Sequence, residues 1–331
     1  MPQSRKSQIS LKDTPYYHCI SRCVRRSYLC GVDKHTGQSY EHRKQWVEDR
    51  LMLLVDIFAI DLCAFAVMSN HTHVVLHVNF KQARKWSGLE VLSRWHKLFK
   101  GTGLTQRFIN PDSRKAMTAG ERLVVSQSIE IYRERLYDIS WFMRSLNEYI
   151  ARIANQEDSC TGRFWEGRFK SQALLDEAAL LARMAYVDLN PVRAGITSKP
   201  ESAEHTSIFL RAKCAKQNTQ PGSLWPFIGE KFRFRKIPNG ISFNLLDYMT
   251  LLEETGRSID EQRRGCIGEN KSTILDRVGI SESNWLILTK EFEQHFNFAV
   301  GAEHLLEGFK KRTKRKRIWG ISAAKALLQL T

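Results

Sequence analysis

The sequence predicts an α+β fold in which an antiparallel sheet packs against helices. Two observations support this class. Short segments rich in β-branched and apolar residues alternate with helical patterns in the first hundred residues, and helical patterns dominate the rest of the 331 residues. A chain of this length is long enough for two domains.

The first elements follow the order strand, helix, strand, strand, helix. Residues 16–23 alternate as a strand does, and residues 42–60 repeat apolar side chains at helical spacing. Residues 61–68 and 71–78 form two strands around a short hairpin turn, and residues 81–101 form the second helix. This order is that of a ferredoxin-like sandwich, an antiparallel sheet with helices on one face.

The later segments are less regular. Residues 101–126 are expected to form a long loop, residues 129–156 one long amphipathic helix, and residues 162–175 a strand. A helix with Asp176 as its N-cap follows, and Pro191 is expected to end it.

We therefore expect three parts, with a C-terminal all-α domain. These are a sheet-containing catalytic domain, a connector without periodicity, and a helical, basic accessory domain that binds DNA; their boundaries are 1–200, 201–240 and 241–331.

The charge of the chain indicates its partner. Lysine and arginine number 51 against 35 acidic residues, a net charge of +16, and such an excess favours nucleic acid. An anionic membrane surface is the competing partner, but no run approaches 18 apolar residues and the first residues hold no apolar signal core, so we expect a soluble, cytoplasmic protein. The seven scattered cysteines fit neither a disulfide framework nor a zinc knuckle, and we expect them reduced.

The stretch SNHTHVVLHV, residues 69–78, places His71, His73 and His77 on one face of a strand. Neutral imidazole is the commonest protein metal ligand, and a His-x-His pair can converge on one cation. A structural role for each histidine, with one satisfied hydrogen bond, is the alternative.

The stretch AYVDLNPVRAG places a phenol and an amide together. Tyr186 and Asn190 are four residues apart, so on a helix their side chains share a face. Taken alone, the pattern favours a structural interpretation, a buried tyrosine and an asparagine that ends the helix.

Three segments in this order resemble the REP-associated tyrosine transposases, which belong to the HUH single-tyrosine transposases of simple bacterial insertion sequences (the insertion-sequence-200-like family). They are NHTHVVLH, GRFWEGRFKS and YVDLNPVRAGI, and the opening YYHCISRCVRRSYL is also similar. The resemblance covers roughly residues 13–198. One departure is Thr72, where the family usually has a bulky hydrophobic residue between the histidines; His77 is no part of the motif.

The resemblance implies an HUH nuclease fold and a metal-dependent enzyme that nicks and rejoins DNA through a 5′-phosphotyrosine. Tyr186 would be the nucleophile, and His71, His73 and Asn190 would hold Mg²⁺ or Mn²⁺. Mixed nitrogen and oxygen ligands suit these ions. The implied substrate is single-stranded or hairpin DNA of the REP-palindrome kind, bound by a monomer or homodimer at the bacterial nucleoid.

Two alternatives stay open. One is a catalytically silent DNA-binding descendant, against which the intact His71, His73, Tyr186 and Asn190 argue. The other is an HUH replication initiator or relaxase, against which the NPVRAG context and the lack of a phosphate-binding ATPase loop argue.

Candidate DNA contacts combine cations with aromatic rings, a mixture that suits stacked bases on a charged groove. They lie on the first strand, directly before the helix that contains Tyr186, and in a C-terminal run with seven basic residues between Lys310 and Arg317. The candidates are His18, Arg22, Arg163, Trp165, Arg168, Lys170, Lys314 and Arg315. Trp86 and Trp95 lie in a fourth basic stretch and are either base-stacking or core residues.

Overall fold

The computed structural model describes residues 8–24, 29–33, 36–229, 239–259 and 274–328. Its centre is a five-stranded sheet with the order β2-β3-β1-β4-β5. All neighbouring strands are antiparallel except β4 and β5, which are parallel. The strands are β1 (Tyr16–Arg22), β2 (Ile60–Val67), β3 (His71–Val78), β4 (Lys170–Leu174) and β5 (Ala299–Val300).

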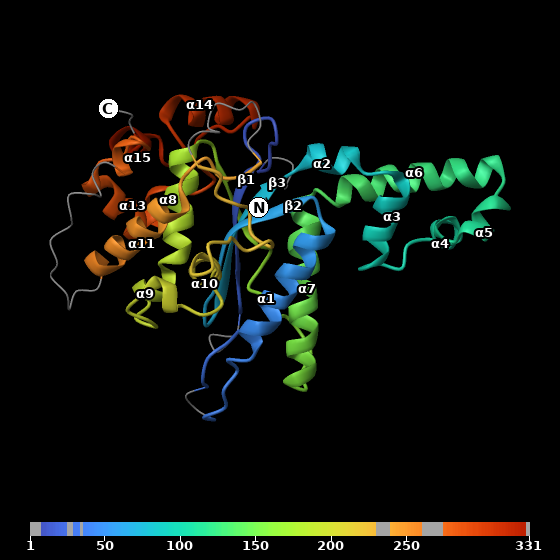
Figure 1. Cartoon of the computed structure of the whole chain (residues 1–331), viewed down its shortest axis with the longest axis horizontal. Helices are drawn as coiled ribbons and strands as arrows, with labels where there is room; N and C mark the ends of the chain where they lie inside the picture. Colours follow the sequence, from blue (N-terminus) through green and yellow to red (C-terminus); the bar gives the residue numbers. More distant parts are fainter. Residues whose placement is uncertain (1–7, 25–28, 34–35, 230–238, 260–273, 329–331) are drawn as a thin grey trace.

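The α+β class and the antiparallel sheet with packed helices are therefore confirmed. The order of the first four strands, 2-3-1-4, is that of the ferredoxin-like arrangement. Helices α1 (Arg43–Ile57) and α7 (Ile139–Glu157) cover one face, while α8 (Glu177–Asp188) covers the other (Figure 1). Helices thus lie on both faces, where the order of elements had predicted one.

The candidate site depends on the face to which α8 packs. Small residues of β2, Ala64 and Ala66, oppose Val75 and His73 of β3 and allow α8 to approach closely. Asp176 accepts a hydrogen bond from the backbone nitrogen of Ala179, which confirms it as the N-cap of α8.

The expected loop at 101–126 is wrong, and so are the two long helices at 81–101 and 129–156. Polar residues that accept hydrogen bonds from the next turn begin new helices in these stretches; they are Ser87, Thr102, Asn110, Thr118 and Asp138. The helices are α2 (Phe80–Lys85), α3 (Gly88–His96), α4 (Gly103–Ile109), α5 (Pro111–Lys115) and α6 (Ala119–Arg135).

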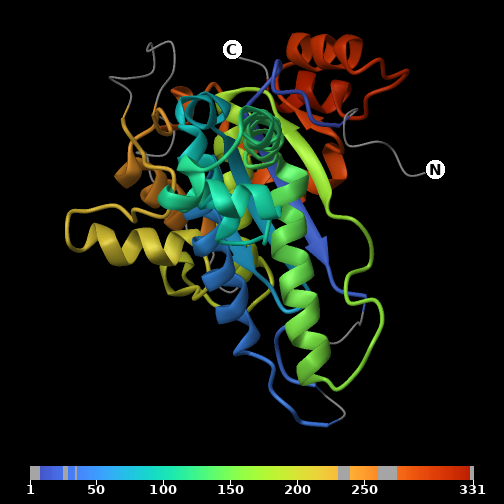
Figure 2. The same cartoon turned by 90° about the vertical axis from the view of Figure 1, so that its right-hand side faces the viewer.

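Helices α3 to α6 form an arm that projects from the sheet in Figure 1 and points toward the viewer in Figure 2. Trp95 lies inside the arm, 3% exposed, and stacks on Phe99 and Tyr132. Trp86 is partly buried beneath the guanidinium of Arg94. The core interpretation therefore holds for Trp95, which cannot stack on a base in this structure.

The remaining residues are mainly helical and pack back onto the sheet domain. Helix α13 contacts α8, and β5 extends the sheet beside β4, so the C-terminal part adds one two-residue strand to its helices. The domain division stays a prediction. The elements are α9 (Asn190–Arg193), the short turn η2 (Pro200–Ser202), α10 (Ser207–Ala215), α11 (Leu245–Ile259), α13 (Glu282–His295), α14 (Glu303–Arg312) and α15 (Ile321–Leu327).

Two further features bear on the expectations. Six cysteines in the described residues are free thiols, and Cys266 lies outside them. No helix within the described ranges is long and apolar enough to cross a membrane.

Candidate functional site

One row of side chains crosses the α8-facing side of the sheet. The register places His73 of β3 opposite Ile20 of β1, and His18 of β1 opposite Gln172 of β4. Residues that pair directly across antiparallel strands share a face, so these side chains and their i±2 neighbours lie together. The sheet register, which local sequence does not specify, therefore brings β4 next to the histidines.

The His-x-His pair faces the tyrosine of α8. The rings of His71 and His73 have centroids 4.7 Å apart, and the ring of His73 lies 6.1 Å from that of Tyr186. His73 is 2% exposed and Tyr186 is 5% exposed. The structure thus brings together three of the four residues that the motifs single out for chemistry.

Asn190 lies four residues after Tyr186, at the start of α9, where the chain continues α8 with almost helical backbone angles. It is 7% exposed, and its Nδ2 atom has no hydrogen-bond partner among the described residues. Its amide nitrogen therefore retains N–H groups that can donate to an additional acceptor.

His71 is held as a neutral donor of a lone pair. Its Nδ1 lies 2.6 Å from Oδ1 of Asn70, an acceptor, so Nδ1 carries the proton and Nε2 is unprotonated. Burial, together with the charges of Arg22 and Arg193, lowers the pKa of His71 to about 4. At neutral pH, Nε2 is available to a metal ion or a hydrogen-bond donor.

A chain of hydrogen bonds fixes His73 differently. Nε of Arg183 donates to Nδ1 of His18 over 2.9 Å, so the proton of neutral His18 is on Nε2 and points to Nδ1 of His73, also at 2.9 Å. Burial lowers the pKa of both imidazoles well below the usual value. In this arrangement neutral His73 carries its own proton on Nε2 and offers a donor there.

Two guanidinium groups flank Tyr186. Nη2 of Arg193 donates to the phenol oxygen over 3.3 Å, and its carbon lies 4.0 Å from the ring centroid. The guanidinium carbon of Arg183 lies 4.6 Å from the same ring and 4.3 Å from the ring of Phe292 in α13. The C-terminal part thus packs directly on the tyrosine and on the arginine beside it.

Arg183 and Arg193 were not among the predicted site residues. They lie three residues before and seven residues after Tyr186, spacings that place side chains on the same side of a continuous helix. That spacing was the available signal, but only the fold shows that this side of α8 faces the histidines.

The predicted DNA contacts occupy different places. Arg22 is exposed and lies opposite His71, whereas His18 is 1% exposed with both ring nitrogens hydrogen-bonded, so it orients His73 instead of lying on the surface. Arg168 and Lys170 line a cavity beside His18 and Arg183.

The other candidates lie farther from the histidines. Arg163 is exposed, and Trp165 is half-buried with its indole N–H donated to the carbonyl oxygen of Asn147 at 2.7 Å. Lys314 is exposed, while the guanidinium of Arg315 lies 4.1 Å from the ring centroid of Phe298, which lines the cavity.

His77 belongs to a separate cluster. Its Nδ1 lies 2.7 Å from Oδ2 of Asp61, and its ring stacks on Trp225 with centroids 4.6 Å apart. The structural alternative thus accounts for the packing of its ring and for the hydrogen bond of its Nδ1.

No group of three or more histidine, cysteine or acidic side chains suited to a metal ion occurs within the described part of the chain. A metal at His71 and His73 would need the Asn190 amide or solvent to complete its ligands. His71 fits such a role as it stands. His73 fits it once the proton moves from Nε2 to Nδ1, which requires His18 to accept through Nε2 and Arg183 to release Nδ1 of His18.

Comparison with known proteins gives one weak likeness. No family model matches the chain, and no curated protein matches it. A solved structure of a REP-associated tyrosine transposase bound to a REP hairpin is similar, with 12% identity over 69% of this chain and 99% of that chain, and a TM-score of 0.38. That protein is of the family that the sequence motifs resemble.

Proposed function

We propose that this protein is a transposase-type endonuclease that nicks and rejoins single-stranded or hairpin DNA through Tyr186. The observation that carries the proposal is the placement of Tyr186 between two guanidinium groups and beside the His71–His73 pair. The charge of +16 favours a nucleic-acid substrate. REP-like palindromes, action in the cytoplasm at the nucleoid, and a monomer or homodimer belong to the same proposal.

The proposed chemistry is a phosphoryl transfer to Tyr186. The phenol oxygen of Tyr186 attacks phosphorus, the bond from phosphorus to the 3′ oxygen breaks, and the proton of the phenol ends on that oxygen through solvent. The products are a 5′-phosphotyrosine and a free 3′-hydroxyl. Arg193 would stabilise negative charge on the phenol oxygen, and Arg183 charge on the phosphate. Reversal on another 3′-hydroxyl rejoins the strand without an external energy source.

The proposal includes a divalent metal, Mg²⁺ or Mn²⁺, at His71, His73 and Asn190. When bound, the ion would act as a Lewis acid on the phosphate oxygens. The free Nε2 of His71 supports it. His73 would join after its proton shifts to Nδ1, as described above.

A catalytically silent DNA-binding protein is the second candidate. Two observations favour it: Tyr186 is 5% exposed under Phe292, and Nε2 of His73 carries a proton in the hydrogen-bonded chain. A replication initiator or relaxase, the other alternative, has no observation in its favour among the described residues.

Covalent capture separates the two candidates. End-labelled hairpin DNA with single-stranded flanks is incubated with the protein and Mn²⁺ or Mg²⁺, then run on a denaturing gel. We expect a metal-dependent shifted band, and we expect Tyr186→Phe to abolish it. Tyr132→Phe should retain the band, because Tyr132 lies in the helical arm. Hairpin binding with no band for any of the proteins would establish the silent binder, and a band in Tyr186→Phe would assign another nucleophile.

Metal binding is tested without turnover. Titration of Mn²⁺ followed by electron paramagnetic resonance should give a site that His71→Ala weakens. His77→Ala is the matched control, because His77 lies on the same strand but pairs with Asp61. Equal Mn²⁺ affinity in the wild type and His71→Ala would remove the metal from the proposal.

A further inference from the structure

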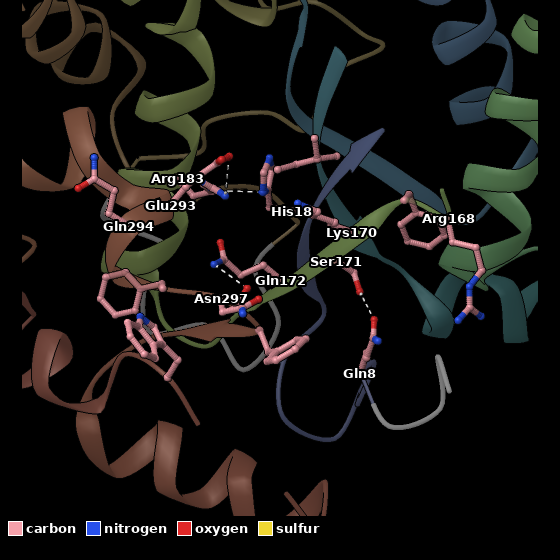
Figure 3. A pocket seen from close by; sticks show the side chains of 15 residues that line it. Gln8, His18, Arg168, Lys170, Ser171, Gln172, Arg183, Glu293, Gln294 and Asn297 are labelled. Carbon is pink, nitrogen blue, oxygen red and sulfur yellow. Dashed lines mark hydrogen bonds and ion pairs between the residues drawn. The ribbon is translucent and has the colours of Figure 1, made fainter. Parts of the chain in front are cut away.

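A cavity of about 800 Å³ lies next to the tyrosine site, and of its lining residues only Arg183 takes part in the chemistry above. It opens between β4 on one side and the segment from α13 to β5 on the other (Figure 3). His18 and Arg183 form part of its wall, so the cavity is continuous with the hydrogen-bonded chain that ends at His73.

A buried acceptor without a partner faces this cavity. Gln172 is 5% exposed, and its Nε2 donates to the carbonyl oxygen of Asn297 over 3.0 Å, which fixes the amide and directs Oε1 into the cavity (Figure 3). Oε1 has no hydrogen-bond partner in the part of the chain that the structure describes. Because a buried, unpaired acceptor is unfavourable, it calls for a donor from a ligand.

The Arg183 guanidinium leaves a second atom available. Arg183 is 2% exposed, and its Nη1 has no hydrogen-bond partner within the described residues. Its carboxylate neighbour, Glu293, lies 3.8 Å from Nη2. The cavity thus holds a buried acceptor and a buried cationic donor, a pair that fits a ligand with both N–H groups and negative charge.

Aromatic and cationic side chains complete the wall. Phe296, Phe298 and Trp319 come from the C-terminal part, and the indole of Trp319 is 68% exposed at the rim. Arg168 and Lys170 come from the β4 side. Aromatic faces beside cations are the combination with which proteins bind unpaired bases on a charged backbone.

We propose that this cavity binds one unpaired base of the DNA strand whose phosphate Tyr186 attacks. The base stacks on Trp319, its exocyclic amine donates to Oε1 of Gln172, and Lys170 with Arg168 contacts the adjoining phosphates. Adenine, cytosine and guanine carry such an amine and thymine lacks it, so the cavity disfavours thymine. The inference rests on the proposed DNA substrate and gives the C-terminal part a role in reading that substrate.

The test compares two oligonucleotides that differ in the exocyclic amine. Binding of fluorescein-labelled ten-nucleotide oligo(dC) and oligo(dT) to the full-length protein is measured by anisotropy without divalent metal. We expect the wild type to prefer oligo(dC) about fivefold, the worth of one hydrogen bond, and Gln172→Met to remove that preference. Gln106→Met is the matched control, because Gln106 also donates its amide to a carbonyl oxygen, but in the helical arm.

A second variant tests the stacking wall. Trp319→Ala should weaken binding of both oligonucleotides about tenfold, whereas Leu246→Ala, a change at an equally exposed apolar side chain in α11, should leave binding unchanged. Trp319→Phe should restore most of the affinity, because it retains an aromatic face.

The outcomes separate this inference from the proposed function. A preference that persists in Gln172→Met overturns the base site, even if the covalent band of the capture assay forms. A preference that disappears in Gln172→Met with no covalent band leaves the base site standing and overturns the cleavage. No measurable binding of either oligonucleotide by the wild type overturns both.

Discussion

Tyr248→Phe should destabilise the protein by an amount that depends on pH. Tyr248, in α11, is fully buried and donates its hydroxyl to Oδ2 of Asp188 over 2.7 Å. Asp188, at the end of α8, is also fully buried and accepts from the Ser207 hydroxyl and, over 3.1 Å, from the backbone nitrogen of Ile208. The carboxylate thus joins the tyrosine helix to α10 and α11.

The magnitude follows from the charge on Asp188. Burial raises its pKa to about 6, while the hydrogen bonds from Ser207 and Tyr248 oppose that rise. Above pH 6 the hydrogen bond that the variant removes is to an ionised carboxylate, worth about 1.5–3 kcal/mol; below it the bond is to a neutral acid, worth about 0.5–1.5 kcal/mol. Tyr248→Phe should therefore cost about twice as much free energy of unfolding at pH 8 as at pH 5.

In the wild type, Asp188 changes the free energy of unfolding with pH in the opposite direction to an ordinary carboxylate. The folded pKa of Asp188 lies above the unfolded value of about 3.9, so the native state binds the proton more tightly. Its contribution to stability is complete below about pH 4 and is lost as the pH rises through 6. Removing the Tyr248 hydrogen bond raises the folded pKa further and enlarges that loss.

Urea unfolding at pH 5 and pH 8, followed by circular dichroism, measures both effects. Tyr132→Phe is the control, since Tyr132 is also buried but lies in the arm and stacks on Trp95. An equal cost for Tyr248→Phe at the two pH values would refute the reasoning, because it would mean that Asp188 does not change its charge between them.

Three further outcomes are expected. Asp176→Ala should lower the free energy of unfolding by about 1–2 kcal/mol in urea titrations. The reason is that Asp176 caps α8 and also accepts a hydrogen bond from the backbone nitrogen of Ala302 over 2.7 Å. A cost below roughly 0.5 kcal/mol, the lower limit for a cap, would contradict this. Arg183→Gln should tighten Mn²⁺ binding in calorimetry. Glutamine can accept a hydrogen bond from Nδ1 of His18, which lets Nε2 of His73 present a lone pair to the ion. Weaker or unchanged Mn²⁺ affinity would show that the hydrogen-bonded chain does not control whether His73 binds the metal. Glutamine at four exposed cations of the C-terminal run should flatten the salt dependence of DNA binding; the four are Lys311, Lys314, Lys316 and Arg317. The slope of log binding constant against log salt concentration should fall in magnitude by about 0.7 for each phosphate that the run no longer neutralises. An unchanged slope would leave the run as a solvated surface.

The helical arm shows where local patterns fail. Residues 101–126 carry several glycine and polar residues, which favour a loop when read by composition. The threonines Thr102 and Thr118 instead begin helices, each with a capping box, and α4 and α6 then pack on each other. Whether such a residue ends one element or begins the next depends on that packing, so composition alone predicted the wrong structure.

Local patterns along the chain were enough to predict the central strands and to single out the candidate site residues, whose roles came from the family resemblance. Alternation set β3 and the common face of His71 and His73, and the four-residue spacing linked Tyr186 to Asn190, because both patterns depend only on neighbours along the chain. The position of the Asp176 cap was equally local. These predictions needed no information beyond one turn or one strand.

Long-range packing set how those residues are protonated, covered and connected. The register of β1 places His18 between His73 and Arg183, and the docking of α13 places Phe292 over Tyr186 and closes the cavity beside Gln172. The two hydrogen bonds of His18 alone join residues 55 and 165 positions apart in the chain, His73 and Arg183. Sequence spacing cannot specify them, because they depend on which faces of the sheet and helices bury each other's surface.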